Sequence, residues 1–335
     1  PYGFDWEDWG RRDAYEVLRH AGEQFSADPS RVYLTGHSMG GHGTWQLGVH
    51  DPGVFAAIAP SAGWESFWSY RGQRPEPATP AAAIVQESGN ESDTGALLVN
   101  LAETPVAILH GDADDNVPVR EARTMREKLR AIGVEPVYHE QPGAGHWWEN
   151  SDEPGAECLD WPAFFDLFAR SRLPAAAEVR RVRLATFNPA VTSRRAWATI
   201  LTQRESMRLS TIDVVCDPNK RRFVGTTQNV ERLCLRADSL LGSERHVTIT
   251  LDGQTCHLPS LAEDGATYLT RVEGVWALSG PPDGAGKDPG RAGPFKSAFD
   301  RRFVLVRGTA GSDEETAWAD SLTRYHAQTW WVPGN

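Results

Sequence analysis

The chain has 335 residues, of which 40% are hydrophobic and 24% are charged, and its formal net charge is −11. Residues 1–174 hold 27 acidic against 13 basic side chains, so this part offers no basic stripe to nucleic acid or to an anionic membrane. No apolar run approaches the roughly 18 residues that a membrane-spanning helix requires. A chain of this length is expected to form more than one domain.

The first half of the chain alternates between helical and strand-like patterns, which is typical of an α/β sheet. The predicted elements are, in chain order, a helix at 7–25, a strand at 31–35, a helix at 41–49, a strand at 105–109, a helix at 119–132 and a strand at 135–140. The carboxyl ends of parallel strands are where such sheets carry functional residues, so the loops that follow these strands are the first place to look for a site.

The strand at 31–35 runs directly into a Gly-x-Ser-x-Gly motif at residues 36–40, and a helix follows. A serine at a sharp strand-to-helix turn is the arrangement of a nucleophile elbow, which makes Ser38 the candidate nucleophile. The flanking glycines are expected because a Cβ two positions to either side of Ser38 would clash in so tight a turn. The N–H of Met39, at the start of the helix, is the expected donor to an oxyanion.

Two later loops carry side chains that suit the same chemistry. The first holds three carboxylates, Asp112, Asp114 and Asp115, and the second is a glycine-rich loop that presents His146. A serine hydroxyl becomes nucleophilic when an imidazole accepts its proton and a carboxylate orients that imidazole. Taken singly, Asp-rich loops more often cap helices or close turns, and a histidine flanked by glycine is more often a surface residue. Their order after Ser38, acid and then histidine, predicts a serine hydrolase with His146 as general base.

The residues around Ser38 resemble the nucleophile region of prolyl oligopeptidase-type serine peptidases, which are α/β-hydrolases, and closely similar esterases share this region. The family carries its acid in a His-Gly-x-x-Asp-x-x-Val-Pro pattern, which residues 110–118 match and which selects Asp114. Its histidine follows a Pro-Gly-x-Gly-His pattern, matched by residues 142–146. The resemblance covers about residues 1–174. It implies cleavage of a peptide or ester bond through an acyl-enzyme, with no metal and no organic cofactor.

Members of this family run several strands before the nucleophile, whereas a single predicted strand precedes Ser38 here. We therefore expect the chain to begin after the first half of the sheet, so that residues 1–174 form the C-terminal half of an α/β-hydrolase with an exposed strand edge. The second oxyanion donor, which the family takes from an upstream loop, is then expected to lie outside this chain.

Two aromatic-rich segments are candidates for the walls of a substrate pocket. One lies between the elbow and the acid loop, where loops on a rigid sheet commonly set specificity, although its aromatics are equally expected to close the core. Its candidates are Trp64, Phe67, Trp68 and Tyr70. The other pair, Trp147 and Trp148, directly follows His146, so chain adjacency places both near the rim of the site.

Beyond a short linker the pattern changes to successive strands. The predicted elements are strands at 182–187, 222–226 and 232–236, a hairpin at 246–258 with an Asp-Gly turn, a hairpin at 268–278 with a Glu-Gly turn, a strand at 302–308 and a helix at 313–329. We therefore expect three parts: a partial α/β-hydrolase domain at 1–174, a mostly antiparallel, sandwich-like β-module at 178–280, and a Gly/Pro-rich loop with the start of a further α/β unit at 281–335.

The four cysteines, Cys158, Cys216, Cys234 and Cys256, form no Cys-x-x-Cys pair and have no histidines at metal-ligand spacing, so no metal site is expected. A bridge between Cys216 and Cys234 would suit an exported or periplasmic protein, and buried free thiols are equally consistent with the sequence. The compartment therefore stays open, as does the oligomeric state.

Three functions follow from the pattern, and cleavage of peptide bonds by a serine peptidase is the first. The second is a carboxylesterase, such as a carbohydrate acetyl or feruloyl esterase, because esterases use the same triad. The third is a non-catalytic scaffold whose strand-rich half binds glycans. Its candidate aromatics are Trp197, Trp276, Trp330 and Trp331, for which a packing role is favoured because large aromatics are usually buried.

Overall fold

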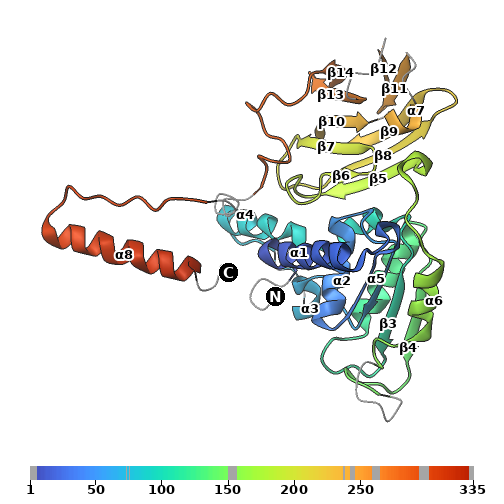
Figure 1. Ribbon diagram of the computed structural model, residues 1–335, viewed down its shortest axis with the longest axis horizontal. Coiled ribbons are helices and arrows are strands. Elements are labelled where there is room, and N and C mark those ends of the chain that lie inside the picture. Colours follow the sequence, from blue (N-terminus) through green and yellow to red (C-terminus); the bar gives the residue numbers. More distant parts are fainter. Residues whose placement is uncertain are drawn as a thin grey trace.

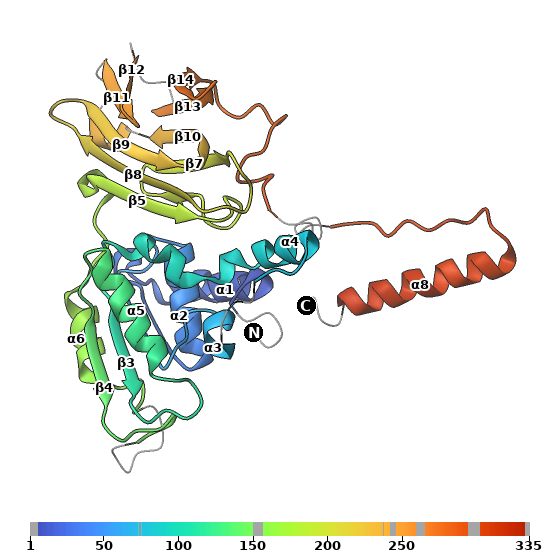
Figure 2. The same ribbon diagram turned by 180° about the vertical axis from the view of Figure 1, so that it is seen from behind.

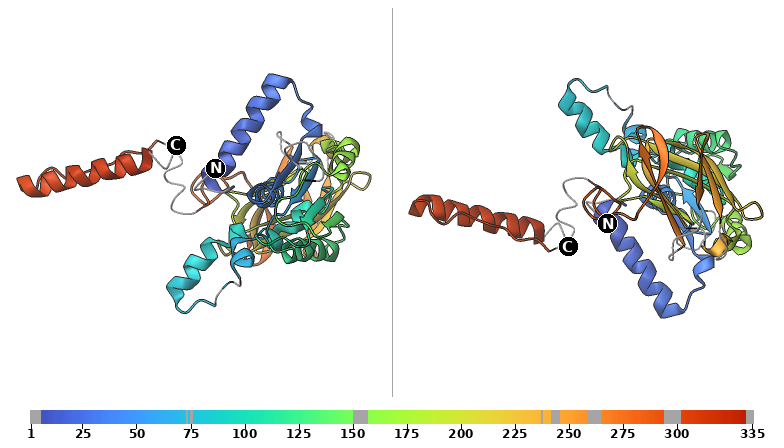
Figure 3. Two further views of the ribbon diagram at one scale, coloured as in Figure 1. Left: turned by 90° about the horizontal axis from the view of Figure 1, so that it is seen from below. Right: turned by 90° about the horizontal axis from the view of Figure 1, so that it is seen from above.

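The computed structural model describes residues 6–72, 74, 76–149, 157–236, 238–241, 246–258, 265–293 and 302–331. Two bodies account for most of these residues: a parallel sheet flanked by helices, and above it in Figure 1 a body of mostly antiparallel strands. The same stacking is seen from behind in Figure 2. The last helix, α8 (Asp313–Trp331), extends away from both bodies in every view (Figures 1 to 3).

The first body is built on four parallel strands in the order β1-β2-β3-β4. They are β1 (Tyr33–His37), β2 (Ala57–Ser61), β3 (Ala107–Gly111) and β4 (Val137–Gln141). Within the described residues β1 and β4 are the edges of this sheet, so the exposed strand edge expected from the sequence falls at β1. The predicted strands at 31–35, 105–109 and 135–140 all begin two residues before β1, β3 and β4. Single backbone hydrogen bonds to Val32, Pro105 and Val106 already join neighbouring segments before the regular ladders begin.

Helices cover both faces of this sheet. They are α1 (Asp8–Phe25), α2 (Met39–His50), α3 (Phe67–Arg71), α4 (Pro80–Ser88), α5 (Arg120–Ala131) and α6 (Pro162–Arg170), with shorter turns η1 (Pro29–Arg31), η2 (Asn90–Ser92) and η3 (Thr94–Leu101). Alternate residues of β2 point to opposite faces. Ile58 packs in the core that contains Trp45 of α2 and Met125 of α5, whereas Ala57 packs on the other face with Phe164 of α6. The sheet is therefore buried between two helical layers.

The second body is the sandwich-like module that the sequence predicts. Its sheets have the orders β14-β13-β10-β7-β6 and β12-β11-β9-β8-β5, and all pairs are antiparallel except β9 with β11. The elements are β5 (Arg181–Thr186), β6 (Arg194–Arg195), β7 (Ala198–Gln203), β8 (Ser210–Asp217), β9 (Arg222–Gln228), β10 (Val230–Arg236), α7 (Asp238–Leu241), β11 (Val247–Leu251), β12 (Gln254–Leu258), β13 (Ala266–Val272) and β14 (Val275–Ser279), entered through η4 (Ala176–Glu178). Both predicted hairpins form, and the residues of their two-residue turns have positive φ angles.

The core of the module settles the role of two of its aromatics. Trp197 and Trp276 are 4% and 3% exposed and pack among the strands of both sheets, so they are packing residues, as favoured from the sequence. The side chains of Trp330 and Trp331 lie outside the described residues. In the described part of the chain none of the four cysteines forms a disulfide. Of the two alternatives for Cys216 and Cys234, the structure therefore has the one without a bridge.

The predicted strand at 302–308 is wrong. These residues pair with no strand in the described part of the chain, and Val304 and Val306 are 84% and 90% exposed. An isolated extended segment has no neighbour to satisfy its backbone hydrogen bonds or to cover its apolar side chains. The helix predicted next does form, as α8. Among the described residues, no helix is long and apolar enough to cross a membrane.

Buried polar contacts join the two bodies. The side chain of Asn100 in η3 donates to the carbonyl oxygens of Val49 and Ala185 at 2.7 and 2.9 Å and accepts from the N–H of Ala185 at 2.6 Å. Nearby, His50 at the end of α2 hydrogen-bonds to Thr192 of the module. We propose a domain boundary at residues 174–178, because most hydrophobic residues on either side of it belong to separate cores.

Candidate active site

Ser38 lies at the turn between β1 and α2, where the backbone is strained. Its φ is 57° and its ψ is −116°, a conformation that L-amino acids rarely adopt. The turn is held by the Ser38 N–H, which donates to the carbonyl oxygen of Ser61 in β2 at 3.0 Å, and by α2, which begins at the next residue. The sharp strand-to-helix turn predicted from the motif is therefore present.

The glycines around Ser38 contribute unequally to this turn. A Cβ on Gly36 would lie 2.8 Å from the Cα of Gly40, so Gly36 is required, as the motif predicts. A Cβ on Gly40 would meet no atom within 4 Å, so the clash expected there is wrong. The close approach lies one residue later, because a Cβ on Gly41 would sit 2.8 Å from the Cα of Gly63, after β2.

Substitution of Gly41 by alanine is expected to destabilise the protein by about 1–3 kcal/mol and to displace the elbow, because two backbone segments would have to separate. Gly40→Ala is the matched control, since it adds the same methyl group one residue away into open space. Thermal denaturation of the two variants checks this. Equal melting temperatures would contradict the assignment of Gly41 as the close-packed glycine.

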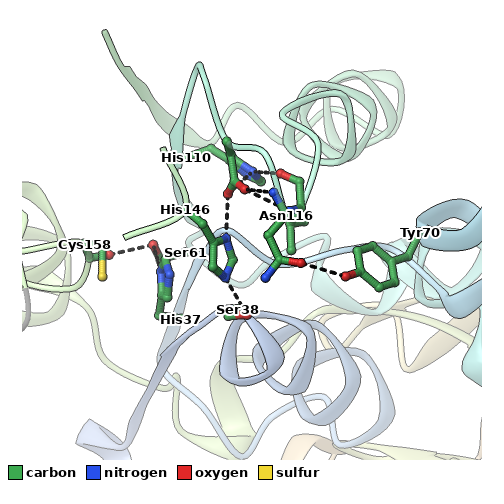
Figure 4. A network of polar contacts seen from close by, with 10 residues as sticks. His37, Ser38, Ser61, Tyr70, His110, Asn116, His146 and Cys158 are labelled. Carbon is green, nitrogen blue, oxygen red and sulfur yellow. Dashed lines mark hydrogen bonds and ion pairs between the residues drawn. The ribbon is translucent and has the colours of Figure 1, made fainter. Parts of the chain in front are cut away.

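The side chains of Ser38, His146 and Asp114 form one hydrogen-bonded chain (Figure 4). Nε2 of His146 is 2.8 Å from the Ser38 Oγ, and Nδ1 of His146 is 2.8 Å from Oδ2 of Asp114. Asp114 follows β3 and His146 follows β4, so the ends of neighbouring strands bring them to the turn after β1. The structure thus brings together the three residues that the sequence selects.

Asp114 is held as a carboxylate. Its Oδ1 accepts hydrogen bonds from the backbone N–H groups of Asn116 and Val117 at 2.9 and 2.8 Å. Burial alone would raise the pKa of Asp114, but the hydrogen bonds from His110, His146 and these two N–H groups outweigh it and lower the pKa to about 2. The charge is therefore available to orient His146 and to stabilise it when it is protonated.

Met39 begins α2, so its N–H belongs to the first turn of the helix, where backbone donors have no partner within the helix. This position beside the Ser38 Oγ is suited to an oxyanion. The carbonyl of Met39 accepts a hydrogen bond from the indole N–H of Trp6 at 2.7 Å, and the Trp6 ring also packs against Gly43. Trp6 therefore supports the start of α2, a role that no motif in the sequence indicates.

His37, at the variable position before Ser38, packs against the loop that bears His146. Its ring centroid lies 4.9 Å from that of His146 and 4.4 Å from that of Trp147. The Ser61 hydroxyl donates to the carbonyl oxygen of Cys158 at 2.6 Å, so it can only accept from Nδ1 of His37 at 3.0 Å. Burial, followed by the charge of His146, lowers the pKa of His37 to about 4, so its ring is neutral near pH 7.

The aromatic candidates separate into three settings. Trp64 is 5% exposed and is stacked between His42 and Tyr70, with Phe67 beside it. Trp68 lies against Arg74 and Gly89. Trp147 is 70% exposed with its ring centroid 5.2 Å from that of His146, whereas Trp148 is half-buried near His37. Trp147 is therefore the best candidate for the rim of the site. We propose that Trp147, and the stack that Trp64 forms with His42 and Tyr70, are walls of the substrate pocket.

A polar contact near the site joins Tyr70, a pocket candidate from the sequence, to Asn116, which the sequence did not single out. The Tyr70 hydroxyl donates to Oδ1 of Asn116 at 3.0 Å, and Figure 4 shows both residues on the side of His146 opposite to His37. The segment that bears Tyr70 and the loop that bears Asp114 are therefore tied together. Among the described residues, no cluster of three or more His, Cys, Asp or Glu could hold a metal ion.

The sequence of this site identifies its family. Residues 2–169 match the model of the prolyl oligopeptidase family, so the chain belongs to that family, and its parallel sheet with helices on both faces is that of an α/β-hydrolase. An uncharacterized secreted protein of Arthroderma benhamiae is 31% identical over 156 residues, which is 44% of this chain and 17% of that protein. A putative carboxymethylenebutenolidase of Salmonella typhimurium is 26% identical over 147 residues, which is 43% of this chain and 47% of that protein.

A solved structure of a putative dipeptidyl aminopeptidase IV from Bacteroides ovatus is 19% identical, with a TM-score of 0.39, and the match covers 48% of this chain and 22% of that one. The family assignment rests on the sequence match. This chain spans less than half the length of each of these relatives.

Proposed function

We propose that this chain is the catalytic part of a serine hydrolase that cleaves peptide bonds. The observation that carries the proposal is the unbroken series of hydrogen bonds from Ser38 through His146 to Asp114, each of 2.8 Å between the side chains. In this proposal the Ser38 Oγ attacks the carbonyl carbon of the substrate while His146 Nε2 takes the hydroxyl proton. The Met39 N–H stabilises the negative oxygen that forms.

The later steps, release of the amine and hydrolysis of the acyl-enzyme, use the same groups. His146 returns its proton to the leaving amine, which departs and leaves Ser38 acylated. A water molecule then attacks the acyl carbon while His146 takes one of its protons. The bond between the acyl carbon and the Ser38 Oγ breaks as His146 returns this proton to that oxygen, which releases the carboxylic acid and restores Ser38. Asp114 remains a carboxylate throughout and holds Nδ1 of His146 as a donor.

An esterase is the second candidate function, and one comparison favours it. The Salmonella relative is named for a butenolide, which is a cyclic ester, and the hydrogen-bonded series described above serves ester and amide cleavage equally. The glycan-binding scaffold has less support, since Trp197 and Trp276 are buried in the module.

Substrates with one acyl group and two leaving groups separate these functions. The same N-acyl amino acid, offered as a p-nitrophenyl ester and as a p-nitroanilide, tests both bonds in one pocket, with Ser38→Ala as the background control. A peptidase is expected to hydrolyse both compounds, and an esterase only the ester. If neither reacts and a fluorophosphonate leaves Ser38 unmodified, the proposed hydrolase activity of this chain is wrong.

A further inference from the structure

A second histidine contacts the carboxylate of Asp114. His110 lies in β3 and its side chain is fully buried. Its Nε2 is 2.8 Å from the carbonyl oxygen of Val117 and 3.3 Å from Oδ2 of Asp114, the oxygen that also receives His146 (Figure 4). The sequence places His110 in the pattern around the acid but assigns it no role.

The protonation of His110 follows from its neighbours. A carbonyl oxygen and a carboxylate oxygen only accept hydrogen bonds, so Nε2 of His110 must carry the hydrogen that points at both. Its Nδ1 is buried and has no hydrogen-bond partner among the described residues. A proton on Nδ1 would therefore be a buried donor without an acceptor, which is costly, so His110 is a neutral imidazole that donates from Nε2.

We propose that His110 is a positioning residue for the triad, which holds Oδ2 of Asp114 toward His146 and limits the basicity of His146. The proposal rests on the proposed function. Two backbone N–H groups donate to Oδ1, while Oδ2 receives Nδ1 of His146 and lies 3.3 Å from Nε2 of His110, so donors at both oxygens hold the plane of the carboxylate. Each donor also draws charge from the carboxylate, so less remains to stabilise protonated His146.

The other titratable groups near His110 are paired or neutral, so they do not mask the effect of His110 on Asp114 and His146. Glu140 lies opposite His110 in the register of β3 with β4, and it is paired with Arg123 of α5. His37, on β1, is held neutral by burial. Asp114 is the carboxylate that the His110 ring contacts, and it is hydrogen-bonded to His146, so removal of the His110 donor changes mainly the pair that the proposal concerns.

Two substitutions of His110 separate its hydrogen bond from its volume. His110→Leu removes the donor, whereas His110→Gln keeps an N–H close to the position of Nε2. In His110→Leu we expect kcat/KM to fall between about tenfold and a hundredfold, which is the effect of a hydrogen bond to a charged group. The acid limb of its pH profile is expected to move upward by about half a pH unit or more, because an unshared carboxylate raises the pKa of His146. His110→Gln is expected to restore most of both properties.

NMR titration of the His146 ring in the full chain gives a second readout that does not need turnover. The pKa of His146 is expected to be higher in His110→Leu than in the unmodified chain or in His110→Gln. The proposal would be overturned if the pKa of His146 were equal in the unmodified chain and in both variants, whether or not the two variants lost activity equally. His110 would then only fill space. Failure of the unmodified chain to react with a fluorophosphonate would overturn the proposed function instead, and the titration would still decide the role of His110.

Discussion

Ser38→Ala is expected to lower kcat/KM at least about a thousandfold for any ester or amide that the chain hydrolyses. The alanine leaves the Met39 N–H and the His146 imidazole in place but removes the atom that attacks the carbonyl. What remains is the weak catalysis that an oxyanion site and bound water provide. The measurement is hydrolysis of an activated ester, together with the intact mass after treatment with a fluorophosphonate.

Ser61→Ala is the matched control for the mass measurement. Ser61 is a buried serine at the end of β2, and its hydroxyl contacts His37 and Cys158 and not His146. The unmodified chain and Ser61→Ala are each expected to gain a single adduct, and Ser38→Ala none. An adduct that persists in Ser38→Ala would place the reactive nucleophile elsewhere.

Asp114→Asn is expected to lower kcat/KM on the order of a thousandfold or more, with the fold unchanged. The side chain keeps its volume and its Oδ1 contacts, but the negative charge that stabilises protonated His146 is lost. An amide N–H facing Nδ1 would also favour the tautomer with its proton on Nε2, which cannot accept the serine proton. Steady-state kinetics on the ester, with circular dichroism to check folding, measures the effect.

Asp115→Asn controls for the change of charge. Asp115 is the next residue in the same loop and is exposed, so its replacement removes one negative charge without touching His146. Activity near that of the unmodified chain is expected. If the two variants lost activity equally, Asp114 would have no special role, and the choice of this carboxylate among the three in the loop would be mistaken.

Local sequence predicts the elements whose pattern is strong by itself. The strands β1, β3 and β4 and both hairpins of the module are predicted, because short apolar runs bounded by Gly- or Asp-rich turns strongly favour strands. The strand β2 is not, since Ala57–Ser61 has a single β-branched residue and becomes a strand through burial between β1 and β3. At 302–308 the sequence predicts a strand that does not form, because this segment has no partner among the described strands in spite of its strong β pattern.

The sequence by itself determined the candidate catalytic residues and their order, because the chemistry of a nucleophile, an acid and a base restricts residue types and the turns that present them. Tertiary structure alone decided how those residues are supported. Three contacts provide this support: the close approach of Gly41 to Gly63, the hydrogen bond from Trp6 to the start of α2, and the contact of His110 with Asp114. Each depends on how the backbone folds and not on a local pattern in the sequence. Such contacts leave no local pattern, since any residue of suitable size and hydrogen-bonding capacity at either end could make them.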